Sequence, residues 1–199
     1  KIEYLGQASE FDLCGDGCAE KPARRRDLRD AIASALMPGG RSIKLLKVLL
    51  TNICENDCGY CGIRASRDSD RQVLRPQELA RSFDEMRRAG LVQGLFLSSG
   101  ICQHAVREMD RLLVSVEIVR QVYEFRGYIH LKILPGAEPA QIERAAQLAD
   151  RVSTNLEAPN PARLARLSER KVFDTQLLSS LRIASKVRRQ SGGRLAPAG

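Results

Sequence analysis

Short apolar segments alternate with longer amphipathic segments through the middle of this 199-residue chain. Four apolar segments have the length and composition of strands, at residues 43–51, 91–98, 127–134 and 152–156. Three segments between them carry apolar residues at helical spacing, at residues 76–89, 106–123 and 139–150. Strands that alternate with helices of this length favour a parallel sheet, and consecutive right-handed βα units curl that sheet. The sequence therefore predicts an α/β fold, a partial (βα) barrel with a mainly parallel curved sheet and outer helices.

Three cysteines follow the first predicted strand with the spacing C-x3-C-x2-C: Cys54, Cys58 and Cys61. Thiolates this close in sequence can bind one metal centre, and the run supplies three ligands. A closed structural zinc site needs four protein ligands, whereas a 4Fe–4S cluster bound by three cysteines keeps one iron open to another molecule. The run therefore favours a cluster over zinc or unligated thiols. Tyr60, inside the run, could shield a cluster or lie beside a cofactor, or only cover hydrophobic surface.

Residues 46–61, which contain the three cysteines, resemble the radical SAM superfamily. In that superfamily the C-x3-C-x2-C cysteines bind a 4Fe–4S cluster, and the fourth iron binds S-adenosylmethionine. Three further segments are similar to radical SAM proteins described as acting in DNA modification or repair, which are related in character to spore photoproduct lyase: GLFLSSGI (94–101), GYIHLKILPGA (127–137) and LADRVSTNLEAPN (148–160). The resemblance implies a radical SAM barrel that binds both cofactors, with the three cysteines as metal ligands.

The resemblance also implies an activity. The expected enzyme reductively cleaves S-adenosylmethionine to a 5′-deoxyadenosyl radical and uses it on DNA, with an electron donor such as flavodoxin or ferredoxin. Two alternatives stay open at this stage. One is a radical SAM enzyme that acts on RNA, a protein or a small metabolite, and the other is a non-catalytic iron–sulfur or zinc-binding module. The sequence assigns no catalytic side chain.

Candidate cofactor contacts follow the second and fourth predicted strands. Ser98, Ser99 and Gly100 stand where radical SAM proteins usually have a Gly-Gly-Glu-like segment that contacts the methionyl amino group. The acid is missing here, so only backbone carbonyls and serine hydroxyls are available, and Gly100 could instead serve a turn. The resemblance suggests that Asn155 and Glu157 contact ribose hydroxyls or the methionyl group. Because an unpartnered buried carboxylate is costly, we expect a ligand or a basic neighbour for Glu157.

His130 and Lys132 lie two residues apart on the third predicted strand and so share a face. On an otherwise apolar strand, that face is expected to line the barrel interior. Lys132 could contact a carboxylate or a substrate phosphate there. The alternative for His130 is a ring that is hydrogen-bonded within the structure.

The other cysteines carry weaker signals. Cys14 and Cys18 occupy a glycine-rich stretch and are read as incidental thiols, with a second metal site or a redox pair as the alternative. Cys102 follows the second predicted strand. It could lie near the active site as a hydrogen-atom donor, or only pack beneath the loop.

Positive charge is concentrated in two places. The net charge is +8, and residues 161–199 hold nine Lys/Arg against two Asp/Glu, with a second basic stretch at residues 21–26. Such stretches can contact the phosphates of DNA, and they can equally be solvated helix faces. No segment resembles a signal peptide, and the apolar runs are too short to cross a bilayer. These features favour a cytoplasmic protein with a nucleic-acid partner and no membrane contact.

We expect two parts in the chain. Residues 1–43 are predicted to form a helical or loop extension, and residues 44–199 a partial core of about four βα units followed by a basic helical tail. Radical SAM cores usually have six such units. The resemblance therefore implies a C-terminally truncated chain, with the remaining strands and substrate-binding elements beyond Gly199 and an unpaired sheet edge within this chain.

Overall fold

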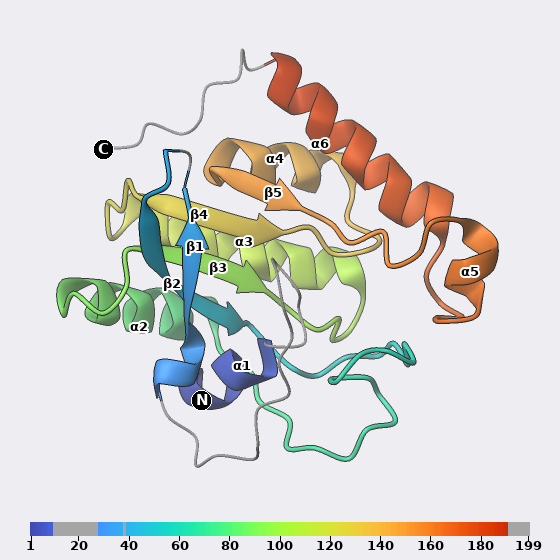
Figure 1. Cartoon of the computed structure of the whole chain (residues 1–199), viewed down its shortest axis with the longest axis horizontal. Helices are drawn as coiled ribbons and strands as arrows, with labels where there is room; N and C mark the ends of the chain where they lie inside the picture. The colour runs from blue at the N-terminus through green and yellow to red at the C-terminus, as the bar shows by residue number, and fades with distance from the viewer. Residues whose placement is uncertain (10–27, 38, 191–199) are drawn as a thin grey trace.

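The computed structural model describes residues 1–9, 28–37 and 39–190. Its centre is a five-stranded sheet with the strands in chain order (Figure 1). The strands are β1 (Ile32–Leu36), β2 (Ser42–Leu49), β3 (Gly94–Ser98), β4 (Tyr128–Lys132) and β5 (Arg151–Ser153). Strands β2 to β5 are parallel, and β1 pairs antiparallel with β2. The predicted α/β class with a mainly parallel sheet is confirmed.

Three helices follow the parallel strands: α2 (Pro76–Arg88), α3 (Ala105–Gln121) and α4 (Pro139–Leu148). Proline at the first turn favours the starts of α2 and α4, and the Glu78 carboxylate accepts a hydrogen bond from the Arg75 backbone N–H at 2.8 Å. The helices bury their apolar faces against one face of the sheet, in one continuous core. Alternate strand residues supply the sheet side of that core, namely Leu46, Val48, Leu95, Leu97, Ile129 and Leu131.

The N-terminal part differs from the prediction of helix and loop alone. It contains α1 (Ile2–Ala8) and the short helix η2 (Leu28–Ala31), but also β1, which extends the sheet. The five residues of β1 include two alanines and a serine, a weak strand signal, and the strand forms through its pairing with β2. Cys14, Cys18 and the basic stretch at residues 21–26 lie outside the described residues.

After β5 the chain forms α5 (Pro161–Ala165), the π-helical turn η3 (Phe173–Leu178) and α6 (Ser179–Gln190). Helix α6 packs against α4 and carries part of the basic stretch, with Arg188 and Arg189 in its last turn. In the part of the chain that is described, no helix is long and apolar enough to span a bilayer. Figure 1 shows the parallel strands pointing toward the side where α5 and the loop after β2 lie. That edge of the sheet carries the candidate site.

Candidate active site at the carboxyl ends of the strands

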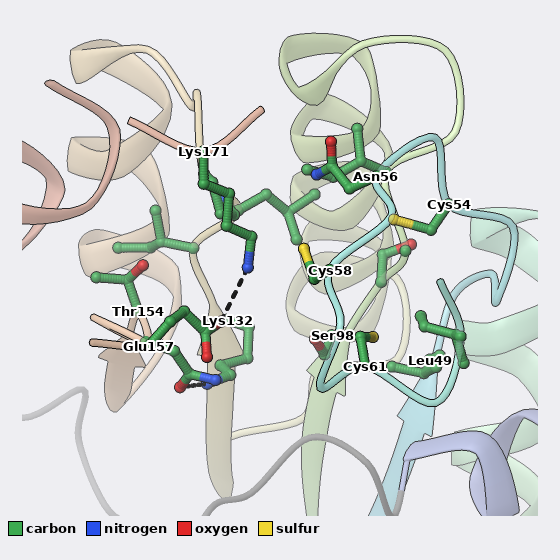
Figure 2. A pocket seen from close by; sticks show the side chains of 18 of the residues that line it. Leu49, Cys54, Asn56, Cys58, Cys61, Ser98, Lys132, Thr154, Glu157 and Lys171 are labelled. Atoms are coloured by element: carbon green, nitrogen blue, oxygen red, sulfur yellow. Dashed lines mark hydrogen bonds and ion pairs between the residues drawn. The ribbon is translucent and has the colours of Figure 1, made fainter. Parts of the chain in front are cut away.

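A pocket opens at the carboxyl ends of β2 to β5. All the site residues that the sequence predicts line this pocket, with the exception of His130. Its two walls differ in origin (Figure 2). One wall is the irregular segment of residues 52–67 after β2, here called the cysteine loop. The other wall is formed by residues at or just after the ends of β3, β4 and β5.

Cys54, Cys58 and Cys61 all reach the pocket from the cysteine loop as free thiols. The buried Cys58 donates a hydrogen bond to the Ser168 hydroxyl at 3.3 Å. Burial raises the pKa of the Cys61 thiol above its ordinary value, and this outweighs the opposing effects of the Ile63 backbone N–H and the Lys171 charge. Across the described ranges, no three His, Cys, Asp or Glu side chains are grouped closely enough to hold one metal ion. The three thiols thus line a pocket and do not converge on a point.

The cysteine loop is pressed against the end of β3. The Gly100 backbone N–H donates to the Thr51 carbonyl at 2.7 Å, and the Glu55 N–H donates to the Ile101 carbonyl at 2.8 Å. A Cβ atom on Gly100 would lie 2.3 Å from the Ile53 carbonyl oxygen. Glycine is therefore needed at position 100 for close approach of the two segments. The φ angle of Gly100 lies outside the left-handed range, so the glycine is not required by a turn conformation.

Ser99 takes part in a buried polar network. Its hydroxyl donates to the Glu108 carboxylate at 2.9 Å, and Glu108 is fully buried. Arg111 pairs with that carboxylate at 2.9 Å and also donates to the Leu74 carbonyl at 2.8 Å. The Ser99 hydroxyl proton is thus directed toward α3, and the hydroxyl of Ser98 and the backbone carbonyls remain as pocket groups of this segment.

Lys132 and His130 lie on the same face of β4 at different depths. The ammonium of Lys132 donates to the Asn155 side-chain oxygen, which joins β4 to the chain after β5. The His130 ring lies one layer deeper, 2.7 Å from the Ser153 hydroxyl and edge-on to Phe96. Burial, with the charges of Arg151 and Lys132, lowers the pKa of His130 to about 3. His130 is thus a neutral, hydrogen-bonded ring outside the pocket lining, as the structural alternative expected.

Glu157 has the basic neighbour that the sequence led us to expect. Lys171, from the segment between α5 and η3, lies 2.9 Å from the Glu157 carboxylate (Figure 2). The same ammonium donates to the Tyr60 hydroxyl at 2.7 Å and lies 5.4 Å from the centre of that ring. Burial and the nearby Glu157 raise the pKa of Tyr60. Lys171 therefore links the two walls across the pocket.

Sequence reasoning missed Lys171 and Thr154. Lys171 was counted among the basic residues of the tail, and nothing in its local sequence separates it from surface arginines. Thr154 lines the pocket, and within the described chain its buried hydroxyl has no hydrogen-bond partner. Cys102 follows the pocket residue Ile101 but does not line the pocket itself.

Comparison with known proteins places the chain in a family. A family model described as the Radical SAM superfamily matches residues 48–193. Among solved structures, methylornithine synthase (PylB) matches with a TM-score of 0.57 and 17% identity, over 70% of this chain and 40% of that one. The FeFe-hydrogenase maturase HydG from Carboxydothermus hydrogenoformans matches with a TM-score of 0.56 and 20% identity, over 70% and 32%. A second structure of HydG matches with a TM-score of 0.56 and 16% identity.

These structural matches establish a shared fold. The chain spans 32% to 40% of the length of these three solved structures. No protein with a curated description matches this sequence.

Proposed function

This chain belongs to the radical SAM superfamily, and we propose that its pocket binds a 4Fe–4S cluster beside S-adenosylmethionine to start radical chemistry. The observation that carries the proposal is that one pocket gathers three thiols from one loop and polar side chains from three strand ends. When bound, the two cofactors together supply a 5′-deoxyadenosyl radical by one-electron reductive cleavage of S-adenosylmethionine.

The donor set fits the cluster. Cys54, Cys58 and Cys61 supply three thiolates and leave one coordination position for a second molecule. On the strand-end wall, the buried hydroxyl of Thr154 has no partner among the described residues. Because such a group costs about 1–3 kcal/mol when it stays unpaired, it supports a polar ligand at that wall.

The opposite wall suits the charges of S-adenosylmethionine. Lys132 offers an ammonium group to a carboxylate, and Glu157 offers a carboxylate to ribose hydroxyls or an amino group. Asn155 holds Lys132, and Lys171 holds Glu157, so each charged group is oriented before a ligand arrives. Orientation in advance lowers the entropy lost on binding.

We propose DNA as the substrate of the whole protein. The support is the sequence resemblance and the charge on α6, where the exposed side chains of Arg182, Lys186 and Arg189 line one shallow groove. RNA, a protein or a small metabolite is the second candidate. The helix charge alone does not favour DNA over RNA, and binding assays must separate them.

Anaerobic reconstitution with iron and sulfide tests the cofactor proposal. We expect about four irons per chain and an electron paramagnetic resonance signal that changes on addition of S-adenosylmethionine. The variant Cys58→Ala should lose the iron, whereas Cys102→Ala, outside the pocket lining, should retain it. Stoichiometric zinc without a response to S-adenosylmethionine would overturn the proposal.

Binding of duplex DNA at several salt concentrations tests the substrate proposal. Neutralising Arg182, Lys186 and Arg189 with glutamine should weaken binding and flatten its salt dependence, since each lost phosphate contact lowers the slope. Arg81→Gln on α2, where the arginine pairs with Glu85, is the matched control. Equal binding of RNA or no binding of DNA would favour the second candidate.

A further inference from the structure

The cysteine loop has no secondary structure to satisfy its backbone. Its residues lie in turns and bends between β2 and α2. Carbonyl groups on the inside of such a loop need donors from elsewhere, because unpaired buried carbonyls are costly. Arg71, just beyond the loop, supplies these donors.

The Arg71 guanidinium donates to carbonyls at both ends of the loop. One terminal nitrogen lies 2.7 Å from the Asn52 carbonyl and 3.0 Å from the Ile63 carbonyl. The other lies 2.8 Å from the Arg64 carbonyl and 2.8 Å from the Arg67 carbonyl. A planar group with five N–H donors can hold several acceptors in fixed directions. Arg71 thereby joins the start of the loop to its end.

These contacts bracket the three cysteines. Asn52 lies two residues before Cys54, and Ile63 lies two residues after Cys61. The backbone on both sides of the thiol-bearing stretch is therefore held to one rigid group. The side chain of Asn52 also joins the start of the loop to the chain just beyond its end. It donates to the Asp70 carbonyl and accepts from the Gln72 N–H, both at 2.7 Å.

We infer that Arg71 is the positioning residue of the cysteine loop, which sets the loop in the shape that presents all three thiols before any cofactor is bound. Its effect comes from its fork of donors and not from its positive charge. Ordering a loop in advance reduces the conformational entropy that three-point ligation would otherwise cost. The part of this inference that concerns iron rests on the proposed function, whereas the part that concerns loop shape does not.

Amide hydrogen exchange of the metal-free full chain tests the inference. We expect Arg71→Lys and Arg71→Met both to raise amide exchange of residues 52–70 by roughly tenfold or more, because the loop loses several side-chain hydrogen bonds to its carbonyls and opens more often. Peptides from β3 and β4 should keep their protection in Arg71→Lys. Reconstituted iron should fall in both variants. Arg81→Lys and Arg81→Met, at an exposed ion pair with Glu85, should match the wild type in both measurements.

Two results would overturn the inference. Unchanged exchange of residues 52–70 in both Arg71 variants would show that the loop keeps its shape without the guanidinium. Wild-type behaviour of Arg71→Lys beside a defective Arg71→Met would show that charge, not the donor fork, is what matters. If the wild type itself takes up no iron, the proposed function fails, while the exchange experiment still decides the role of Arg71.

Discussion

One wall of the pocket is the cysteine loop, and the other is formed by the ends of β3, β4 and β5. The loop is held by side chains that bond to its backbone, above all Arg71 and Asn52. The strand-end wall rests on a parallel ladder with a continuous apolar core behind it. The wall with the three thiols is thus locally held, while the wall with the polar side chains of the strand ends shares the cooperative stability of the domain.

The largest expected effect is on iron content, which a substitution in the cysteine loop should lower and one in the strand-end wall should not. Cys58→Ala is expected to remove nearly all of the roughly four irons per chain, because a three-thiol site loses a ligand. Lys132→Met should keep the iron and weaken binding of S-adenosylmethionine, since the pocket loses its buried ammonium. Iron assays and equilibrium ligand binding measure the two outcomes. Loss of iron in Lys132→Met would mean that the walls are not separable.

The next prediction concerns the close contact between the cysteine loop and the end of β3, at Gly100. Gly100→Ala should destabilise the fold by about 1–3 kcal/mol, because its Cβ would lie 2.3 Å from the Ile53 carbonyl oxygen. Gly59→Ala is the control, since its Cβ would lie 3.9 Å from the nearest atom, the Leu167 carbonyl oxygen. Urea unfolding gives both free energies. Equal stability of the two variants would show that the cysteine loop and the end of β3 can move apart at little cost in free energy.

The third prediction concerns the pH dependence of stability that the buried His130 on β4 causes. His130 has a pKa of about 3 in the folded chain, against an ordinary value near 6.5. Between these values the unfolded chain binds a proton that the folded chain does not, so stability falls as pH falls through 6.5. The loss should approach about 1.4 kcal/mol per pH unit. Above pH 6.5 both states are neutral and this contribution vanishes.

Urea unfolding at pH 7.5 and 5.5 measures this slope. His130→Gln should lower this slope, because the variant lacks the buried ring that titrates. The chain has one other histidine, the exposed His104, and His104→Gln should keep the slope. The same slope in both variants would mean that His130 is not the group responsible.

The smallest effect concerns the link across the pocket. Tyr60→Phe removes the hydroxyl that accepts from Lys171 but keeps the ring beneath the ammonium. We expect a loss of about 0.5–1 kcal/mol in unfolding free energy and no change in iron content, as for one partly exposed hydrogen bond. Thermal unfolding and an iron assay report the two quantities. A fall in iron would show that this link shapes the cysteine loop.

The strand-end wall was the more predictable of the two. Apolar periodicity located β2 to β5, and parallel topology then brought Ser98, Lys132, Asn155 and Glu157 to one edge. The cysteine spacing named the thiols but not the shape of their loop. Arg71 and Lys171 act through contacts far from their neighbours in sequence, for which a single sequence carries no signal. The strand β1 was missed for a related reason, since it depends on pairing more than on its own composition.

Every acceptor of Arg71 in the cysteine loop is a main-chain carbonyl. Main-chain groups are common to all amino acids, so the contacts of Arg71 with residues 63, 64, 65 and 67 do not depend on which side chains stand there. We therefore expect a substitution scan to find tolerance at positions 64, 65 and 67 and almost none at position 71. Positions 63 and 66 should be intermediate, because Ile63 packs against the core and the Ser66 hydroxyl donates to the Asp57 carboxylate at 2.6 Å. Side chains at these tolerant positions can therefore vary without disturbing the thiols beside them.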